Sequence, residues 1–93
     1  MQLLTDDEIT ARLAGLPGWV REGDSIRYTA TRADFRDSLL YVGAVAYLAE
    51  AANHHPDITI QWDKVGLTLS THAAGGLTAA DFALAGQISR LTG

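Results

Sequence analysis

Hydrophobic residues recur along the chain with two periods, which predict three helices and two strand pairs. Spacings of three and four residues, typical of one helix face, occur in 5–16, 34–52 and 78–91, and spacings of two, typical of half-buried strands, occur in 19–32 and 58–71. The predicted order is α-β-β-α-β-β-α. Because hairpin-length turns join the strands of each pair, we expect an α+β fold: a four-stranded antiparallel sheet with helices packed on one face.

The first half of the chain carries clear local signals. Thr5 followed by Glu8 is a capping box, and Ile9, Leu13 and Leu16 follow at helical spacing up to GLPGW. In WVREGDSIRYTATR, the Gly-Asp pair at 23–24 predicts a tight turn, and the alternating residues after it predict a buried face formed by Ile26, Tyr28 and Ala30.

The helix predicted over 34–52 is apolar around much of its circumference. Its two apolar rows are Phe35, Leu39, Val42, Ala46 and Ala49, and Tyr41, Val45, Leu48 and Ala52. A sheet face covers only about one such stripe, so the remaining surface is expected to meet another helix or another subunit. We therefore predict a homo-oligomer.

The second half begins where Pro56 drives His55 towards an extended conformation, which places the helix end near Asn53. Alternation then predicts a hairpin with its turn at Asp63–Lys64. Its inward residues are expected to be Ile58, Ile60, Trp62, Val65, Leu67, Leu69 and Thr71. His72 is expected to end the second strand on the opposite face, and Thr78 to start a last helix with Leu84, Ile88 and Leu91 inward.

Composition narrows the class of protein. The length of 93 residues fits one domain over 1–93, and the formal net charge of -4 disfavours nucleic acid and anionic membranes as partners. The absence of cysteine removes disulfides and thiolate chemistry. The opening MQLLTDDEIT lacks the basic and apolar regions of a signal peptide, and no apolar run reaches membrane-spanning length. We expect a soluble cytoplasmic protein.

The histidines of the chain, His54, His55 and His72, are expected at ends of elements that meet at one rim of the sheet. Each has a structural explanation: the adjacent pair suits a helix C-terminus, His72 suits a solvated strand, and Asp81 suits the third position of a capping box begun by Thr78. Their convergence is what indicates function, because loop ends on a rigid scaffold commonly carry catalytic groups.

Two chemistries use histidines without cysteine. A zinc site with three imidazoles needs all of them aimed at one point, whereas neighbours in an extended segment, such as His54 and His55, point to opposite sides. Acid–base catalysis uses separately placed imidazoles, and Asp81 would fix the tautomer of a histidine that it reaches. Acid–base catalysis is favoured, and a zinc hydrolase remains an alternative that elemental analysis tests.

The spacing of these residues resembles that of the pterin-4a-carbinolamine dehydratases, also called 4a-hydroxytetrahydrobiopterin dehydratases. The positions that carry the resemblance are Glu50, His54, His55, Pro56, Trp62, His72 and Asp81, and the flanking GW, DF and GLT extend it over nearly the whole chain. Two positions depart from it. Asp57-Ile58 stands where an acidic residue and an aromatic one are frequent, and Ala73 stands where aspartate is frequent. Neither removes a candidate catalytic group.

The resemblance implies the dehydration of 4a-hydroxytetrahydrobiopterin to quinonoid dihydropterin, in tetrahydrobiopterin recycling after an aromatic amino acid hydroxylase. It implies His54 and His72 as the acid–base pair, His55 as a group that polarises the departing hydroxyl, and Asp81 as the residue that orients one imidazole. The expected substrate-binding residues are Asn53, Pro56, Ser70 and Thr71. The pterin is the substrate, and no metal or organic cofactor is expected.

An alternative follows from the same resemblance. Family members also serve as a dimerisation cofactor for a homeodomain transcription factor, and degenerate relatives act as assembly factors for ribulose-bisphosphate carboxylase. A non-catalytic protein-binding module on this fold is therefore the second hypothesis, and the broad apolar surface over 34–52 suits it.

Overall fold

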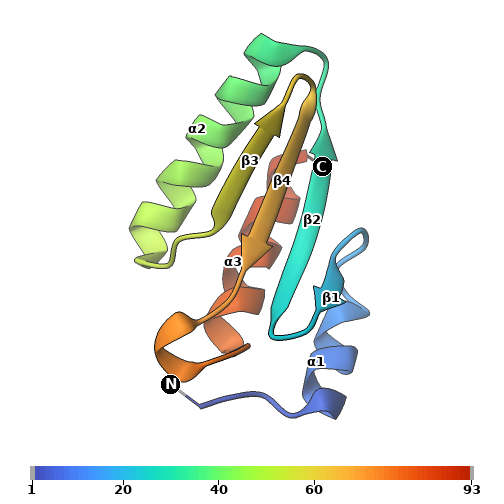
Figure 1. Ribbon diagram of the computed structural model, residues 1–93, viewed down its shortest axis with the longest axis vertical. Helices are drawn as coiled ribbons and strands as arrows, with labels where there is room; N and C mark the ends of the chain where they lie inside the picture. The colour runs from blue at the N-terminus through green and yellow to red at the C-terminus, as the bar shows by residue number, and fades with distance from the viewer. Residues whose placement is uncertain (1, 93) are drawn as a thin grey trace.

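The computed structural model describes residues 2–92 and contains one antiparallel sheet with strand order β1-β2-β4-β3 (Figure 1). The elements are α1 Asp6–Leu13, β1 Val20–Glu22, β2 Ser25–Thr31, α2 Phe35–Ala52, β3 Asp57–Gln61, β4 Lys64–Leu69, η1 His72–Ala74, α3 Ala79–Ser89 and η2 Arg90–Thr92, where η marks a short 3-10 helix. The predicted α+β fold and the α-β-β-α-β-β-α order are confirmed. The central place of β4, between β2 and β3, is an addition to what the spacing predicted.

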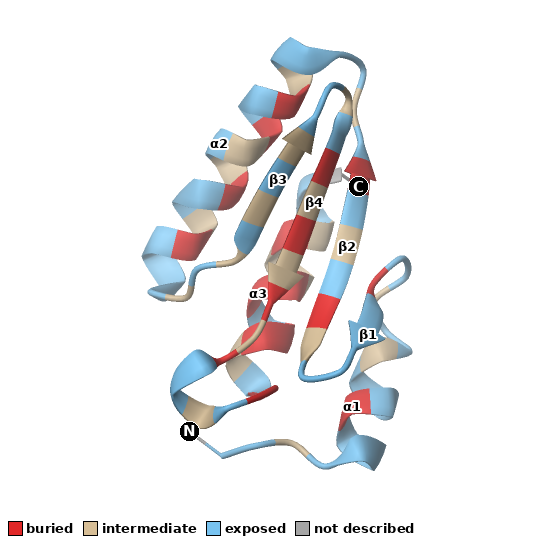
Figure 2. Cartoon of the chain, in the orientation of Figure 1, coloured by how far each residue is buried: buried red, intermediate tan, exposed pale blue. Residues whose placement is uncertain are grey.

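One face of the sheet is buried beneath the helices, and the other face is open. The register aligns apolar residues on the buried face, where Ile26 lies opposite Leu69 and Ile58 lies opposite Leu67. Figure 1 shows α3 behind the sheet and α2 alongside β3, and Figure 2 shows buried residues alternating with more exposed ones along β4. The fully buried apolar side chains are Ile26, Val45, Val65, Leu67, Leu69, Ala85 and Ile88. At about 1.5–3 kcal/mol for each large aliphatic side chain, this layer is the main source of stability.

The predicted caps and the first turn are present. At the start of α1, Thr5 Oγ1 accepts from the Glu8 backbone N–H, and Glu8 Oε1 accepts from the Thr5 backbone N–H at 2.8 Å. The second of these bonds is the largest cause that lowers the pKa of the Glu8 carboxyl below its ordinary value. Gly23, at φ 58°, opens the two-residue turn between β1 and β2, a conformation that glycine adopts without steric cost.

α2 ends where the sequence predicts. Asn53 has left-handed backbone angles (φ 50°, ψ 43°), a conformation that asparagine tolerates better than most residues. The next backbone N–H, of His54, donates to the carbonyl of Ala49 at 3.0 Å, so the last carbonyls of the helix remain hydrogen-bonded. This cap turns the chain sharply, and both adjacent histidines follow it directly.

α2 buries one apolar stripe and leaves the rest of its apolar surface exposed. The buried stripe contains Tyr41, Val45 and Ala49. Four large residues from outside this stripe are 47–74% exposed, and we call them the outer face of α2: Phe35, Leu39, Leu40 and Tyr47. The sheet and α3 cover only one side of the helix, so the two predicted rows are not both buried.

Two residues predicted to lie inward are exposed instead. Trp62 is 71% exposed because the β3–β4 turn falls at Trp62–Asp63, one residue earlier than predicted, with Gln61 paired to Lys64. Leu91 is 41% exposed because α3 ends at Ser89, and the tighter 3-10 turn that follows rotates Leu91 off the helical stripe. In both places the apolar period continues beyond the end of the regular element.

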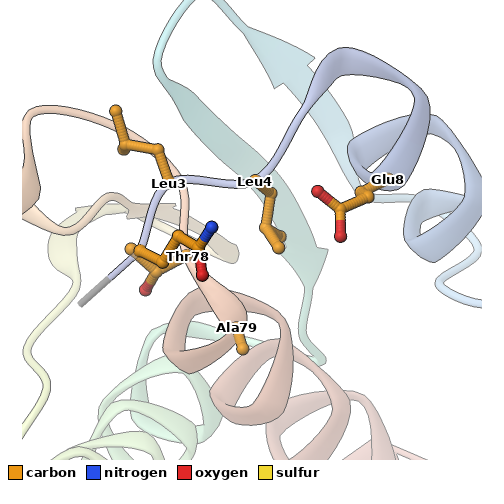
Figure 3. A pocket seen from close by; sticks show the side chains of 6 residues that line it. Leu3, Leu4, Glu8, Thr78 and Ala79 are labelled. Carbon is orange, nitrogen blue, oxygen red and sulfur yellow. The ribbon is translucent and has the colours of Figure 1, made fainter.

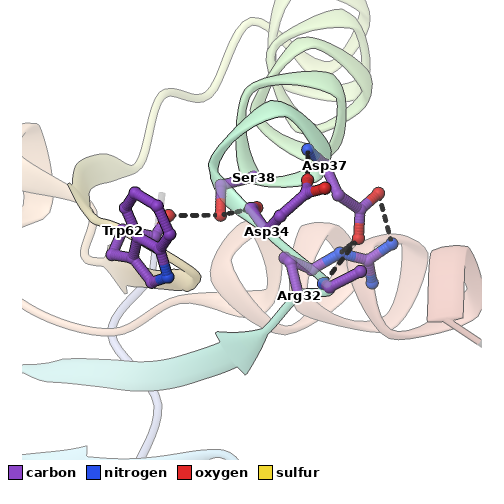
Figure 4. Close-up of polar contacts among 6 residues, drawn as sticks. Arg32, Asp34, Asp37, Ser38 and Trp62 are labelled. Atoms are coloured by element: carbon purple, nitrogen blue, oxygen red, sulfur yellow. Dashed lines mark hydrogen bonds and ion pairs between the residues drawn. The ribbon is translucent and has the colours of Figure 1, made fainter.

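The N-terminal end of α2 is tied to the β3–β4 turn (Figure 4). The buried Ser38 Oγ lies 2.8 Å from the Trp62 carbonyl and 3.1 Å from the Asp34 carbonyl. Asp37 Oδ2 accepts from the backbone N–H of Ala33 and from Arg32 Nε, and the first of these bonds is the main cause that lowers the pKa of Asp37. These contacts fix the angle at which α2 crosses the sheet.

Removal of the Ser38 hydroxyl tests this link. We expect Ser38→Ala to lower the free energy of unfolding by about 1–2 kcal/mol, because a buried hydrogen bond between segments is lost. Ser25→Ala is the matched control, since the Ser25 hydroxyl donates to the carbonyl of Glu22, three residues away, in an exposed position. Urea denaturation followed by circular dichroism gives both values. A loss for Ser38→Ala no larger than that of the control contradicts the link.

Candidate active site

A cleft of about 340 Å³ lies between the C-terminal end of α2 and the loop that follows β4. Six predicted site residues line it together with Ala73: Asn53, His54, His55, Ser70, Thr71 and His72. The volume is within the range of small-molecule pockets, about 300–1,000 Å³. Pro56 and Asp81 do not line the cleft, but Asp81 contacts two residues that do.

Asp81 is fully buried at the start of α3 and is held by three other residues. Its Oδ1 lies 2.6 Å from His54 Nε2. Its Oδ2 accepts from Thr71 Oγ1 at 2.8 Å and from the Thr78 backbone N–H at 2.9 Å. A buried carboxylate without such donors would cost several kcal/mol, so the donors are what permit this position. The same carboxylate closes the predicted capping box of α3 and orients His54.

The adjacent histidines turn to different carboxylates. The His54 side chain is 14% exposed and reaches α3, whereas the exposed His55 pairs through Nε2 with Oε2 of Glu50 in the last turn of α2. Both pairs use Nε2, and within residues 2–92 neither ring has a hydrogen-bond partner at Nδ1. Each imidazole is therefore oriented by an acid and keeps one ring nitrogen for a ligand.

His72 lies in a different element from the one predicted. β4 ends at Leu69, Thr71 makes an isolated bridge to Gly76, and His72 opens the 3-10 helix η1. The prediction of a strand ending at His72 was wrong because the Thr71–Gly76 bridge folds the chain back on itself. The exposed His72 still lines the cleft, opposite the end of α2.

The hydroxyls of Ser70 and Thr71, expected to face a ligand, are both used within the protein. Ser70 Oγ donates to the carbonyl of Asp24 in the β1–β2 turn at 3.0 Å. The Thr71 side chain donates to Asp81 and is 8% exposed as a residue. These two residues therefore hold the loop in place, and they offer the cleft mainly their backbone and surface.

Two residues with contacts at the site were missed as site residues by the sequence reasoning. Thr78 was predicted only as a helix cap, although its Oγ1 lies 2.8 Å from Thr71 Oγ1. Glu50 entered only as part of a motif, although it binds His55. The signal for Glu50 was its position five residues before His55, within reach across a helix end. No local signal marked the contact between Thr78 and Thr71.

A second hollow, of about 250 Å³, lies between the N-terminal segment and the start of α3 (Figure 3). Its lining residues are Gln2, Leu3, Leu4, Glu8, Thr78 and Ala79. The single acid there, Glu8, already caps α1, and no histidine lines this hollow. The residues that can move a proton near neutral pH line the other cleft, so that cleft is the candidate active site.

Within residues 2–92, no group of three His, Asp or Glu side chains is arranged to hold a metal ion. None of the helices in that range is long and apolar enough to cross a membrane.

Comparison with known proteins identifies the family. The family model for pterin 4 alpha carbinolamine dehydratase matches residues 2–91. The chain belongs to this family. A protein of Roseiflexus castenholzii with the provisional name pterin-4-alpha-carbinolamine dehydratase is 55% identical over 89 residues, 96% of each chain. A protein of Mycobacteroides abscessus with the same provisional name is 53% identical over 93 residues, 100% of this chain and 99% of that protein.

Solved structures share the fold of this family member. A protein of Brucella melitensis, described as a transcriptional coactivator/pterin dehydratase, superposes with a TM-score of 0.94 at 28% identity, over 99% of this chain and 100% of that one. A pterin dehydratase-like protein, described as a RuBisCO assembly factor of the alpha-carboxysome, superposes with a TM-score of 0.69 at 23% identity, over 82% and 90%. The second likeness concerns the fold alone.

Loss of the Asp81 carboxylate tests its role in holding the site. We expect Asp81→Ala to lower the free energy of unfolding by about 3–5 kcal/mol, because His54, Thr71 and the Thr78 backbone N–H all lose their acceptor. Glu8→Ala is the matched control: Glu8 has the same place in the α1 capping box but is exposed, so its loss should be about 1 kcal/mol or less. Chemical denaturation compares the two variants. Equal losses in the free energy of unfolding would show that the buried contacts of Asp81 add no stability beyond the cap.

Proposed function

We propose that this family member is an active 4a-hydroxytetrahydrobiopterin dehydratase, a hydro-lyase that converts pterin-4a-carbinolamine to quinonoid dihydropterin and water. The observation that carries the proposal is that His54, which is bound to the buried Asp81, lines one cleft with His72. A role in binding other proteins does not by itself require three histidines and an aspartate at one site. The family match and the named relatives support the same reaction.

The reaction needs two proton transfers at different atoms. The C4a–O bond breaks as the departing hydroxyl gains a proton and leaves as water, and the N5–H proton is removed as the C4a=N5 double bond forms. His54 and His72 line the same cleft from different elements, so one imidazole is the acid and the other is the base. His55, held by Glu50, polarises the departing hydroxyl, and Asn53 with the backbone at 70–71 binds the pterin ring. The chemistry needs no metal and no organic cofactor.

Substitution of the two histidines tests the proposal. We expect His54→Ala and His72→Ala each to lower turnover of synthetic 4a-hydroxytetrahydropterin by about 10²-fold or more, because each removes a proton-transfer group. Stopped-flow absorbance of quinonoid dihydropterin formation measures the rate.

A companion variant separates chemistry from folding. The amide of His54→Gln can still donate to Asp81 but cannot transfer a proton at neutral pH, so we expect a folded protein as slow as His54→Ala. Wild-type turnover in the alanine variants would refute the assignment of both histidines.

A second candidate function rests on the outer face of α2. A contiguous apolar surface of this kind on a small protein marks an interaction site. Two proteins of the same fold are described by their roles as a coactivator and as an assembly factor. The non-catalytic alternative is a binding module that uses this face. A stoichiometric protein partner, together with no dehydratase turnover in the pure chain, would favour it over the enzyme.

We also propose that the outer face of α2 joins copies of this chain into a homo-oligomer. Leu40 and Tyr47 are 63% and 74% exposed and lie on one side of the helix, seven residues apart. Gly43 lies between them, and nothing lies within 4 Å of the place where its Cβ would be. A mid-helix glycine costs about 1 kcal/mol relative to alanine, and close approach of another helix is one use that offsets the cost.

Light scattering at micromolar concentration measures the assembly. We expect a mass of two or more chains for the wild type, and a monomer for the double variant Leu40→Glu, Tyr47→Glu, because burial of two carboxylates opposes association. Val20→Glu is the control, since Val20 is 54% exposed on β1, outside α2. A monomeric mass for the wild type would contradict the proposed homo-oligomer.

A further inference from the structure

The hydroxyls of Thr71 and Thr78 form a chain of hydrogen bonds with a fixed direction. Thr71 Oγ1 has one hydrogen, and it goes to Asp81 Oδ2. The 2.8 Å contact between the two hydroxyls therefore needs Thr78 as its donor. Thr78 Oγ1 in turn accepts from the backbone N–H of Ala80 and closes the capping box with Asp81. The order runs from Thr78 to Thr71 to Asp81.

This chain sets the role of each Asp81 oxygen. Oδ2 is occupied by the Thr71 hydroxyl and the Thr78 backbone N–H, both of which only donate to it. With both donors directed at Oδ2, Oδ1 is the oxygen that accepts from His54 Nε2. A neutral His54 then carries its hydrogen on Nε2, and its bare nitrogen is Nδ1.

We infer that Thr78 and Thr71 are positioning residues that hold His54 in the Nε2–H tautomer, so that Nδ1 is the proton-accepting atom in the cleft. The inference rests on the proposed dehydratase function for its catalytic meaning, but the tautomer is a property of the free protein. Thr78 does not line the cleft, so a change there reaches His54 through Thr71 and Asp81.

The chain contains a matched control for the loss of a cap. Thr5 and Thr78 both begin a helix with a threonine capping box, and the box acid of α1 is exposed whereas that of α3 is buried against His54. Thr5→Val and Thr78→Val thus remove equivalent caps, and only the second removes a hydroxyl bonded to the site. Thr78→Ser keeps the hydroxyl.

The experiment is ¹⁵N NMR of histidine-labelled, ligand-free protein at a pH where the imidazoles are neutral, because the two ring nitrogens report the tautomer directly. We expect a single Nε2–H form of His54 in the wild type, Thr78→Ser and Thr5→Val. In Thr78→Val we expect a mixture of tautomers, because the Thr71 hydroxyl loses the contact that holds it towards Asp81. Thr71→Val, which removes the donor to Asp81 itself, should give the same mixture. An Nδ1–H form in the wild type, or an unchanged tautomer in both valine variants, overturns the inference.

Turnover provides the second readout. We expect Thr78→Val to lower kcat by about tenfold or more with little change in KM, as is typical when a partner of a catalytic group is lost, and Thr78→Ser to restore it. Wild-type kcat in a folded Thr78→Val would overturn the catalytic role. If the wild type shows the Nε2–H tautomer but no dehydratase turnover, the proposed function fails while the positioning of His54 stands.

Discussion

The buried carboxylate of Asp81 is the contact on which the arrangement of the site depends. It joins the segment after α2, through His54, to the loop after β4, through Thr71, and to the start of α3, through the Thr78 backbone N–H. A buried carboxylate is tolerated only when its oxygens accept hydrogen bonds. Displacing any of these segments would leave an Asp81 oxygen without a donor and would lower the stability of the fold. The cleft is the space that remains between the segments so fixed.

The two capping boxes show how much tertiary context adds to a local motif. Thr5 with Glu8 and Thr78 with Asp81 satisfy the same backbone groups. The exposed Glu8 accepts from the backbone of the cap residue, whereas the buried Asp81 does so with one oxygen and binds the His54 imidazole with the other. A helix cap is a suitable place for such a group, since it already supplies backbone donors to an acid and fixes its side chain. Both boxes pair a threonine with an acid three residues later, as TDDE in α1 and TAAD in α3, and the surroundings of each box decide whether it is only structural.

Local signals in the sequence predicted the helices and strands. Long-range contacts determine where the elements end and which partners the polar side chains bind, and the sequence did not show these. Gly23 and Asn53 each have a conformational preference that sets a turn or a helix end, and both acted as expected. Trp62 and Leu91 were misplaced because apolar spacing carries no information about where backbone pairing stops. The cluster of imidazoles followed from element ends, but the hydroxyls of Ser70 and Thr71 are taken by partners that no local pattern reveals, such as the Asp24 carbonyl 46 residues away.

α2 connects this site to the exposed apolar surface. The first turn of α2 is fixed by the hydrogen bond from Ser38 to the Trp62 carbonyl of the β3–β4 turn, and its last turn is fixed by the Asn53 cap. The helix therefore cannot shift without moving His54. Tyr47 and Glu50 are three residues apart and share a side of the helix. A molecule packed over Tyr47 would therefore also approach Glu50, and the exposed pair of Glu50 and His55 would lose solvent. Because a hydrogen bond is stronger where water does not compete for it, association through the outer face of α2 would be coupled to the orientation of His55. The two roles proposed for this chain, association and catalysis, would therefore involve neighbouring residues on one side of α2.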